Sequence, residues 1–272
     1  MTNTAADRVA AGRRHTMSQR GFLGLAALAF LASAAGTVAW CASMAGMGRM
    51  AMPGGWTMSM TWMPMPGRTW SAATTFLAMW FVMMAAMMLP SLVPMLWRYR
   101  LAVGRETPGL GRLTVLVAAG YFLVWGLIGA ALYPPGVALA AAAMREPDLA
   151  RAAPMLAALT VMAAGAFQFT GWKARALACC RRMPDRAMAL PNRTGAALHC
   201  GLRLGLHCAA CCGNLMALLV VAGLMDLVAM AAVTLAISAE RLAPGGRHVA
   251  HGLRIALVGT GAVLAARAAG LF

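Results

Sequence analysis

The sequence predicts an all-α protein, a polytopic bundle of transmembrane helices, and three observations carry this prediction. Of the 272 residues, 61% are hydrophobic and only 11% are charged, whereas about a quarter of a soluble domain is charged. The mean hydropathy is +0.72. Apolar runs of membrane-spanning length recur along the chain, and the basic residues between them crowd into alternate connecting segments. These features exclude an ordinary soluble globular domain.

Seven apolar runs approach the length of about 20 residues that a helix needs to cross the hydrocarbon core of a bilayer. They cover residues 22–43, 71–97, 113–133, 154–172, 204–224, 227–239 and 253–272. The sixth run is short and follows the fifth through Met225 and Asp226, so we expect a tight helical hairpin there. The seventh carries Arg267 near its end, and it either snorkels that charge to the interface or lies along the surface. We therefore expect six or seven spans.

The net charge of +16 follows from how Lys and Arg are distributed. With a cytoplasmic N-terminus, 18 of the 23 basic residues lie inside, in the tail and in the segments after the second, fourth and sixth runs. This positive-inside asymmetry predicts a multi-pass protein of a bacterial inner (cytoplasmic) membrane. We therefore expect the lipid bilayer to be the partner of the chain. The positive charge follows from membrane topology and does not indicate a nucleic-acid partner.

The first apolar run has two interpretations. Its basic start and the small residues Ala32, Ser33 and Ala34 resemble a secretory signal peptide, but the apolar stretch continues through Trp40, which is too long for a signal core. We therefore interpret it as a retained anchor. Residues 1–21 would then form a cytoplasmic tail, and residues 22–272 a single membrane domain with an outer loop at 44–70.

That outer loop holds eight of the 24 methionines. Thioether sulfur is a soft, uncharged ligand that suits Cu(I) and needs no deprotonation. The most closely spaced candidates for such ligands are Met58, Met60, Met63 and Met65. The alternative is an interfacial loop whose Met and Trp side chains rest among the lipid headgroups.

The second apolar run places Met79, Met83 and Met87 at successive i, i+4 positions, so they form one stripe, with Met84 and Met88 beside it. Met83 and Met87 are therefore further candidate metal ligands. Pro90 and Pro94 each remove a helix donor and free a carbonyl group one turn earlier. The alternative is helix packing by adaptable Met side chains.

A dense set of cysteines occurs in the run HCGLRLGLHCAACCGNLM, which starts at His199. On a helix, Cys208, Cys211 and Cys212 share one face, with His207 one turn before Cys211 as a possible fourth ligand. Three thiolates can hold Cu(I) or Zn(II). Cys200 lies about 12 Å away along the helix axis, so it can bind the same ion only if the helix breaks at Gly201 or Gly205. The alternative is that these cysteines are small buried apolar residues.

Polar residues inside apolar runs are costly and often functional. Gln168, Asn214 and Glu240 fall at the depth expected for the start of the cysteine helix, and they either support the metal ligands or hydrogen-bond between helices. Cys179 and Cys180 follow the fourth run among Lys173 and several arginines, a setting that favours thiolate.

Several stretches resemble the bacterial domain-of-unknown-function family 2182, described as predicted metal-binding integral membrane proteins. They are WFVMMAAMMLPSLVPM at 80–95, AGAFQFTGWKARALACCR at 164–181, LGLHCAACCGNLM at 204–216, and residues 223–247. The resemblance covers roughly residues 69–259, the family-like core. It implies that the family's polar and thiol positions fall here on Gln168, Lys173, Cys180, Cys208, Cys211, Cys212 and Glu240. Ala176, Gly213 and Asp226 depart from the pattern, and Ala176 weakens a four-thiolate site.

Three functions remain open at this point. The leading hypothesis is a membrane protein that handles a soft metal, Cu(I) in the first place with Zn(II) as the alternative, by transport or delivery between the outer methionines and the inner cysteines. A second is an accessory or assembly subunit, with a metallochaperone or metalloenzyme as partner. A third is a thiol–disulfide redox protein that uses Cys208 and Cys211. The seven acidic residues are scattered, and no arrangement of Ser, His and Asp suggests hydrolytic catalysis. We therefore do not expect an enzyme of that kind.

Overall fold

The computed structural model describes residues 5–46, 50–58, 62, 69–104, 107–182, 194–243 and 246–270. Helices make up nearly all of this part of the chain, which confirms the predicted all-α class. They are α1 (Ala5–Gly46), α2 (Thr69–Val103), α3 (Leu110–Arg145), α4 (Pro147–Phe167), α5 (Gly171–Arg182), α6 (Thr194–Ala222), α7 (Leu227–Leu242) and α8 (Gly246–Ala268). Two short strands, β1 (Met50–Ala51) and β2 (Thr57–Met58), pair antiparallel between α1 and α2.

Five helices of the described chain are long and apolar enough to cross a membrane, namely α1, α2, α3, α4 and α6. The other two expected spans correspond to α7 and α8. Helix α7 has 16 residues, about 24 Å of helix, and α8 carries Arg247, Arg254 and Arg267 along its 23 residues. The protein is thus an all-α membrane protein. The expectation of a sixth and a seventh span depends on α7, which is short, and on α8, which carries more charge.

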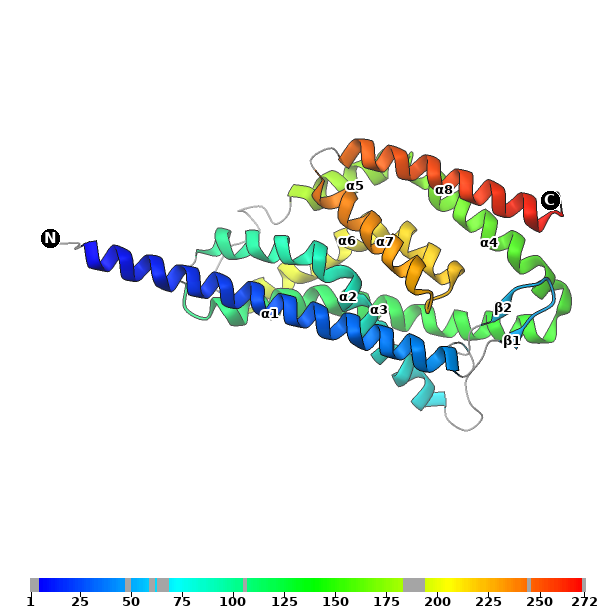
Figure 1. Cartoon of the computed structure of the whole chain (residues 1–272), viewed down its shortest axis with the longest axis horizontal. Coiled ribbons are helices and arrows are strands. Elements are labelled where there is room, and N and C mark those ends of the chain that lie inside the picture. The colour runs from blue at the N-terminus through cyan, green and yellow to red at the C-terminus, as the bar shows by residue number, and fades with distance from the viewer. Residues whose placement is uncertain are drawn as a thin grey trace.

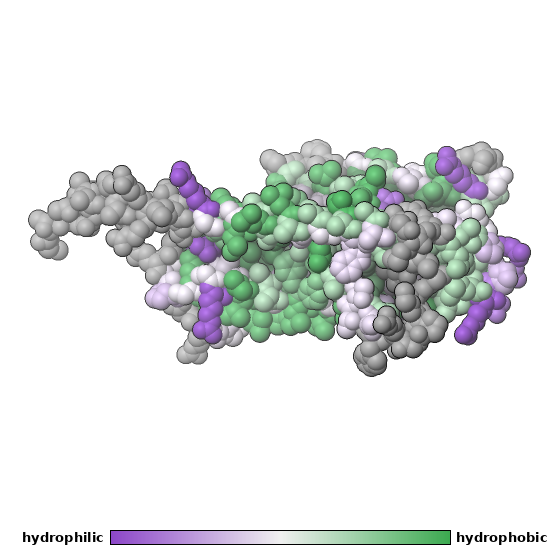
Figure 2. Space-filling model, turned by 60° about the horizontal axis from the view of Figure 1, so that its bottom comes forward, coloured by the Kyte–Doolittle hydropathy of each residue, from purple (hydrophilic) through white to green (hydrophobic). Residues whose placement is uncertain are grey.

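Most helices run roughly along the long axis of the molecule (Figure 1). The N-terminus lies at the end where α2 and α5 finish, which we call the α5 end, and β1–β2 and the C-terminus lie at the opposite, hairpin end. A hydrophobic surface separates more hydrophilic residues at the two ends (Figure 2). Leu25, Leu127 and Leu235 are each more than 60% exposed on three different helices. Together with the five long apolar helices, this exposed hydrophobic belt fits a membrane protein.

Helices α3 and α6 approach each other closely because glycines face the neighbouring backbone. A Cβ atom on Gly201 would lie 2.2 Å from the carbonyl oxygen of Val117, and one on Gly120 would lie 2.6 Å from that of Leu198. Small residues at such crossings are how membrane helices bring their backbones together. This packing fixes the cysteine face of α6 against α3.

The predicted fourth span ends earlier than expected. Helix α4 ends at Phe167, and α5 begins at Gly171. The Thr170 hydroxyl donates to the carbonyl oxygen of Phe167 at 2.8 Å and accepts from the backbone N–H of Lys173 at 3.3 Å, so it terminates one helix and caps the next. The span expected over 154–172 thus corresponds to α4, which is long and apolar enough to cross a membrane, but the helix ends at Phe167 and the break lets α5 take its own direction.

The tight hairpin expected between the fifth and sixth runs is confirmed. Helix α6 ends at Ala222, Gly223 adopts a φ of +110°, and α7 begins at Leu227. Asp226 caps α7, since its carboxylate accepts from the backbone N–H groups of Val228 and Ala229, both at 2.9 Å. The turn brings Glu240 and Arg241 of α7 back beside the cysteine face of α6.

The described part of the outer loop packs on the α3–α4 turn. The Trp56 indole N–H donates to the carbonyl oxygen of Ala150 at 2.8 Å. Met52 and Met58 are buried in a small hydrophobic cluster with Ala140, Ala143 and Ala150. Part of this segment is therefore folded against the helices, although the sequence predicted only a loop.

Candidate metal centre

Three cysteines share the buried face of α6. Cys208, Cys211 and Cys212 are all 1% exposed or less. The sulfur atoms of Cys208 and Cys212 lie 3.5 Å apart, and the Cys212 thiol donates to the carbonyl oxygen of Cys208 at 2.9 Å. Cys211 follows Cys208 by three residues, so its side chain lies on the same face of α6. Because α6 is continuous through Gly201 and Gly205, Cys200 stays two turns away from this group.

Cys180 of α5 completes a four-cysteine cluster, which consists of Cys180, Cys208, Cys211 and Cys212. Its sulfur lies 3.1 Å from Cys211 Sγ and 3.0 Å from the carbonyl oxygen of His207. The pKa of the Cys180 thiol is raised above its usual value, first by its hydrogen bond to Cys211 and then by burial. His207 itself is half-buried and meets the cluster through its backbone oxygen.

Two further helices reach the cysteine cluster. Met88 of α2 places its sulfur 4.0 Å from Cys208 Sγ. The Tyr121 hydroxyl of α3 lies 2.9 Å from the same sulfur, where either atom can donate. Both side chains are fully buried. The cluster is therefore shielded from water and lined by sulfur, with one phenol that can stabilise a thiolate at Cys208.

A buried arginine supplies positive charge to the cysteine cluster. Arg241 of α7 is 6% exposed, and its Nη2 lies 3.5 Å from both Cys180 Sγ and Cys211 Sγ. Its Nη1 donates to Ser91 Oγ at 2.9 Å. Within the described residues, Arg241 makes no ion pair with a carboxylate. A buried cation is costly without an anion beside it, so the position of Arg241 fits a cluster that carries thiolate charge.

The preceding residue, Glu240, belongs to a separate ion pair. Lys173 Nζ lies 3.0 Å from Glu240 Oε2, and both side chains are at most 2% exposed. Lys173 also donates to Asn214 Oδ1 at 3.3 Å and to the carbonyl oxygen of Cys211. Asn214 in turn donates to the carbonyl oxygen of Ala164 at 3.1 Å. This network ties α4, α5, α6 and α7 together directly behind Cys211.

Several buried polar atoms near this network have no partner among the described residues. They are the two amide atoms of Gln168, Glu240 Oε1 and Arg241 Nε. Buried polar groups are nearly always paired in stable proteins, and exceptions often mark functional sites. Gln168, expected beside the cysteines, is fully buried at the end of α4 but makes no described hydrogen bond with them.

The spacing of the sulfur atoms shows what metal binding would require. Three sulfurs that surround one ion at about 2.3 Å lie about 4.0 Å from one another. The Cys208–Met88 distance of 4.0 Å matches this value. The thiol pairs at 3.1 Å and 3.5 Å must each open by somewhat under about 1 Å. Accordingly, no group of three or more His, Cys, Asp and Glu in the described chain is arranged to hold a metal ion as it stands.

The methionines predicted as ligands fall into three groups. Met79, Met83 and Met87 form the expected stripe on α2 and are at most 5% exposed. Met58 is packed in the hydrophobic cluster at the hairpin end, away from any described cysteine. Met60, Met63 and Met65 lie outside the described residues.

The partners that come from other helices are not predicted by the sequence. Arg241 is one of several basic residues near the inner ends of the apolar runs, and no pattern distinguishes Tyr121 or Ser91. One signal was available for Arg241, because it directly follows Glu240 at the end of an apolar run. Nothing in the sequence indicates that Tyr121 and Ser91 face the cysteines.

Comparison with protein families gives one match. A family model named PpoB2 and described as a copper chaperone matches residues 77–264, which is more than half of the chain. All of the cysteine cluster, together with Met88, Tyr121 and Arg241, lies within the matched segment. No curated protein and no solved structure matches. The match is compatible with the resemblance to a metal-binding membrane family and relates the chain to copper.

Proposed function

Since the chain belongs to the copper chaperone family PpoB2, we propose that it is a membrane-embedded copper-delivery protein that holds Cu(I) in the cysteine cluster. Copper is its cargo rather than a resident cofactor. The observation that carries the proposal is the contact of four buried cysteines with Met88 and with the guanidinium of Arg241. Thiolate and thioether sulfur are the ligands that Cu(I) prefers.

The charges of the buried groups favour a particular stoichiometry. Lys173 and Glu240 compensate each other, so Arg241 leaves the cluster with one surplus positive charge. Two thiolates and one Cu(I) ion carry one negative charge together, and Arg241 neutralises it. A Zn(II) ion would need three thiolates for the same balance. Copper is preferred here because of the family, and charge balance then predicts that two cysteines lose their protons.

Delivery requires that the ion can leave, and the closed thiol pairs are suited to this. The sulfur atoms of Cys180 and Cys211 lie 3.1 Å apart, and those of Cys208 and Cys212 lie 3.5 Å apart. Sulfur atoms this close can contact one another once the ion has left, so that no open cavity remains. The acceptor would be a protein that takes Cu(I) through its own sulfur ligands, because ligand exchange between soft donors needs no free ion.

The test is a Cu(I) titration of the purified full chain under reducing conditions, in competition with a chromophoric Cu(I) chelator. We expect Cys208→Ser/Cys211→Ser to lose the tightest binding event. Cys200→Ser is the matched control, because Cys200 is buried in the same helix but lies outside the cluster. Equal affinity and stoichiometry in the wild type and the double variant would overturn the proposal.

A further inference from the structure

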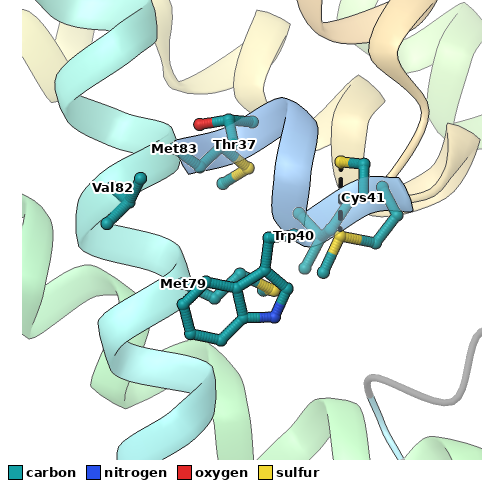
Figure 3. A pocket seen from close by; sticks show the side chains of 8 residues that line it. Thr37, Trp40, Cys41, Met79, Val82 and Met83 are labelled. Atoms are coloured by element: carbon teal, nitrogen blue, oxygen red, sulfur yellow. Dashed lines mark hydrogen bonds between the residues drawn. The ribbon is translucent and has the colours of Figure 1, made fainter. Parts of the chain in front are cut away.

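Four sulfur-bearing side chains surround a cavity that lies between α1, α2 and the α6–α7 turn and includes none of the cysteine cluster. Cys41 of α1 directs its thiol at Met225 in the α6–α7 turn, with 3.7 Å between Sγ and Sδ (Figure 3). Met79 and Met83 of α2 line the same space. The cavity has a volume of about 10 Å³, which is room for a single small ion. Cys41 lies outside the segment that matches the copper chaperone family.

We propose that this cavity is a second Cu(I) site, formed by Cys41, Met79, Met83 and Met225, from which copper reaches the cysteine cluster. The inference rests on the proposed function, since it assumes that the cysteine cluster holds copper. It adds a site that the family match does not cover and a direction from which the ion arrives.

The lining of the cavity selects a soft ion. Besides the four sulfur-bearing residues, the lining is mainly hydrocarbon from residues such as Val82 and Leu224. The hydroxyl of Thr37 donates to the carbonyl oxygen of Ser33 at 2.8 Å, and the indole nitrogen of Trp40 is a donor that cannot ligate a cation. Hard cations such as Mg²⁺ and Ca²⁺ require several oxygen ligands. Sulfur ligands in an apolar setting suit Cu(I).

The charge of this second site also fits a monovalent ion. Cu(I) replaces the single proton of the Cys41 thiol, so binding leaves the net charge of the site unchanged. No buried cation like Arg241 is then needed, and none of the described residues that line the cavity is charged. Three neutral thioethers and one thiolate should hold Cu(I) less tightly than two thiolates beside a guanidinium. The affinities therefore favour transfer toward the cysteine cluster.

The methionines of α2 connect the two sites. Met79 and Met83 line the cavity, Met83 is followed one turn later by Met87, and Met88 contacts Cys208. From Met83 to Met88 the helix rises only about 7.5 Å. All of these methionines are at most 5% exposed. A Cu(I) ion can thus move between sulfur ligands along one buried helix face without entering water or lipid.

The experiment counts Cu(I) ions bound by the full chain in detergent, again in competition with a chromophoric chelator. The wild type should bind two ions with different affinities. Cys41→Ser/Met225→Leu should lose the weaker event and keep the tighter one, and Cys208→Ser/Cys211→Ser should do the reverse. Met230→Leu is the matched control, because Met230 is a buried methionine of α7 that does not line the cavity.

Conservative variants guard against a folding defect. Leu and Met have similar volumes, so Met79→Leu and Met83→Leu should fold. Each substitution should lower the Cu(I) affinity of the weaker binding event at least about tenfold, since even the loss of a group that only orients a ligand typically lowers metal affinity by that factor. Two bound ions with unchanged affinities in Cys41→Ser/Met225→Leu would overturn the second site. In that case, if Cys208→Ser/Cys211→Ser still loses the tighter binding event, the proposed function is supported without the second site.

Discussion

Replacing Arg241 tests whether its charge serves copper binding or only the fold. We consider Arg241→Met, which keeps a long flexible side chain but removes the guanidinium that lies 3.5 Å from Cys180 Sγ and Cys211 Sγ. At an effective dielectric constant of about 20, each thiolate at this distance attracts a unit positive charge by about 5 kcal/mol. Repulsion from a Cu(I) ion about 5 Å away cancels about 3 kcal/mol of the combined attraction.

The upper bound on the contribution of Arg241 to copper binding is therefore about 6 kcal/mol. Relaxation and water penetration reduce such values, and a single charged neighbour typically accounts for about 1.4 to 4 kcal/mol. We expect Arg241→Met to lower the Cu(I) affinity about 100-fold, and Arg241→Lys to recover most of it. The assay is the chelator competition under reducing conditions at fixed pH.

The same substitution should act differently on the copper-free protein. Without copper, Arg241 is a buried cation that makes no ion pair with a carboxylate and has an unpartnered Nε among the described residues. A buried charge of this kind is costly, so the melting temperature of copper-free Arg241→Met should equal or exceed that of the wild type. A folded Arg241→Met protein that binds Cu(I) within about threefold of the wild type would refute the reasoning.

Three further predictions concern packing, the ion pair and pH. Gly201→Val should prevent close packing of α3 and α6, because its Cβ would meet the carbonyl oxygen of Val117 at 2.2 Å. Gly213→Ala is the control and should leave the packing unchanged, because a Cβ there has nothing within 4 Å. Size-exclusion profiles and melting temperatures of the two variants test this. Lys173→Met leaves Glu240 buried without its partner and should lower the free energy of unfolding by about 3–5 kcal/mol. Lys173→Met/Glu240→Gln removes the unpaired charge as well and should recover part of this loss. Equal stability of the single and the double variant would contradict the prediction. Because the pKa of Cys180 is raised, its thiol carries a proton at neutral pH, and Cu(I) must displace this proton. The Cu(I) affinity should therefore rise with pH, about tenfold per pH unit for each proton released. A constant affinity in titrations repeated across neutral pH would argue against thiolate ligands.

Much of the fold could be predicted because lipid leaves few choices. Apolar runs of spanning length must become helices when their backbone groups have no water to bond. The turn at Asp226 could be predicted from a run interrupted by a short polar residue. The break at Gln168–Thr170 could not, because it depends on a hydroxyl that caps α5 and not on hydropathy.

The candidate site was predictable within one helix and not between helices. The i, i+3 and i+4 spacing of Cys208, Cys211 and Cys212 follows from helix periodicity alone. The approach of Cys180 depends on the separate direction of α5, and that of Arg241 on the return of α7. Likewise, Cys41 pairs with Met225 across 184 positions, and no local pattern indicates such a contact.

The most direct test of the central claim is the copper X-ray absorption spectrum of the wild type loaded with an equimolar amount of Cu(I). We predict sulfur neighbours only, at about 2.3 Å, and a loss of that signal from the tight site in Cys208→Ser/Cys211→Ser. A spectrum with nitrogen or oxygen neighbours at about 2.0 Å, or one that the double substitution leaves unchanged, would contradict a thiolate-held copper ion in this cluster.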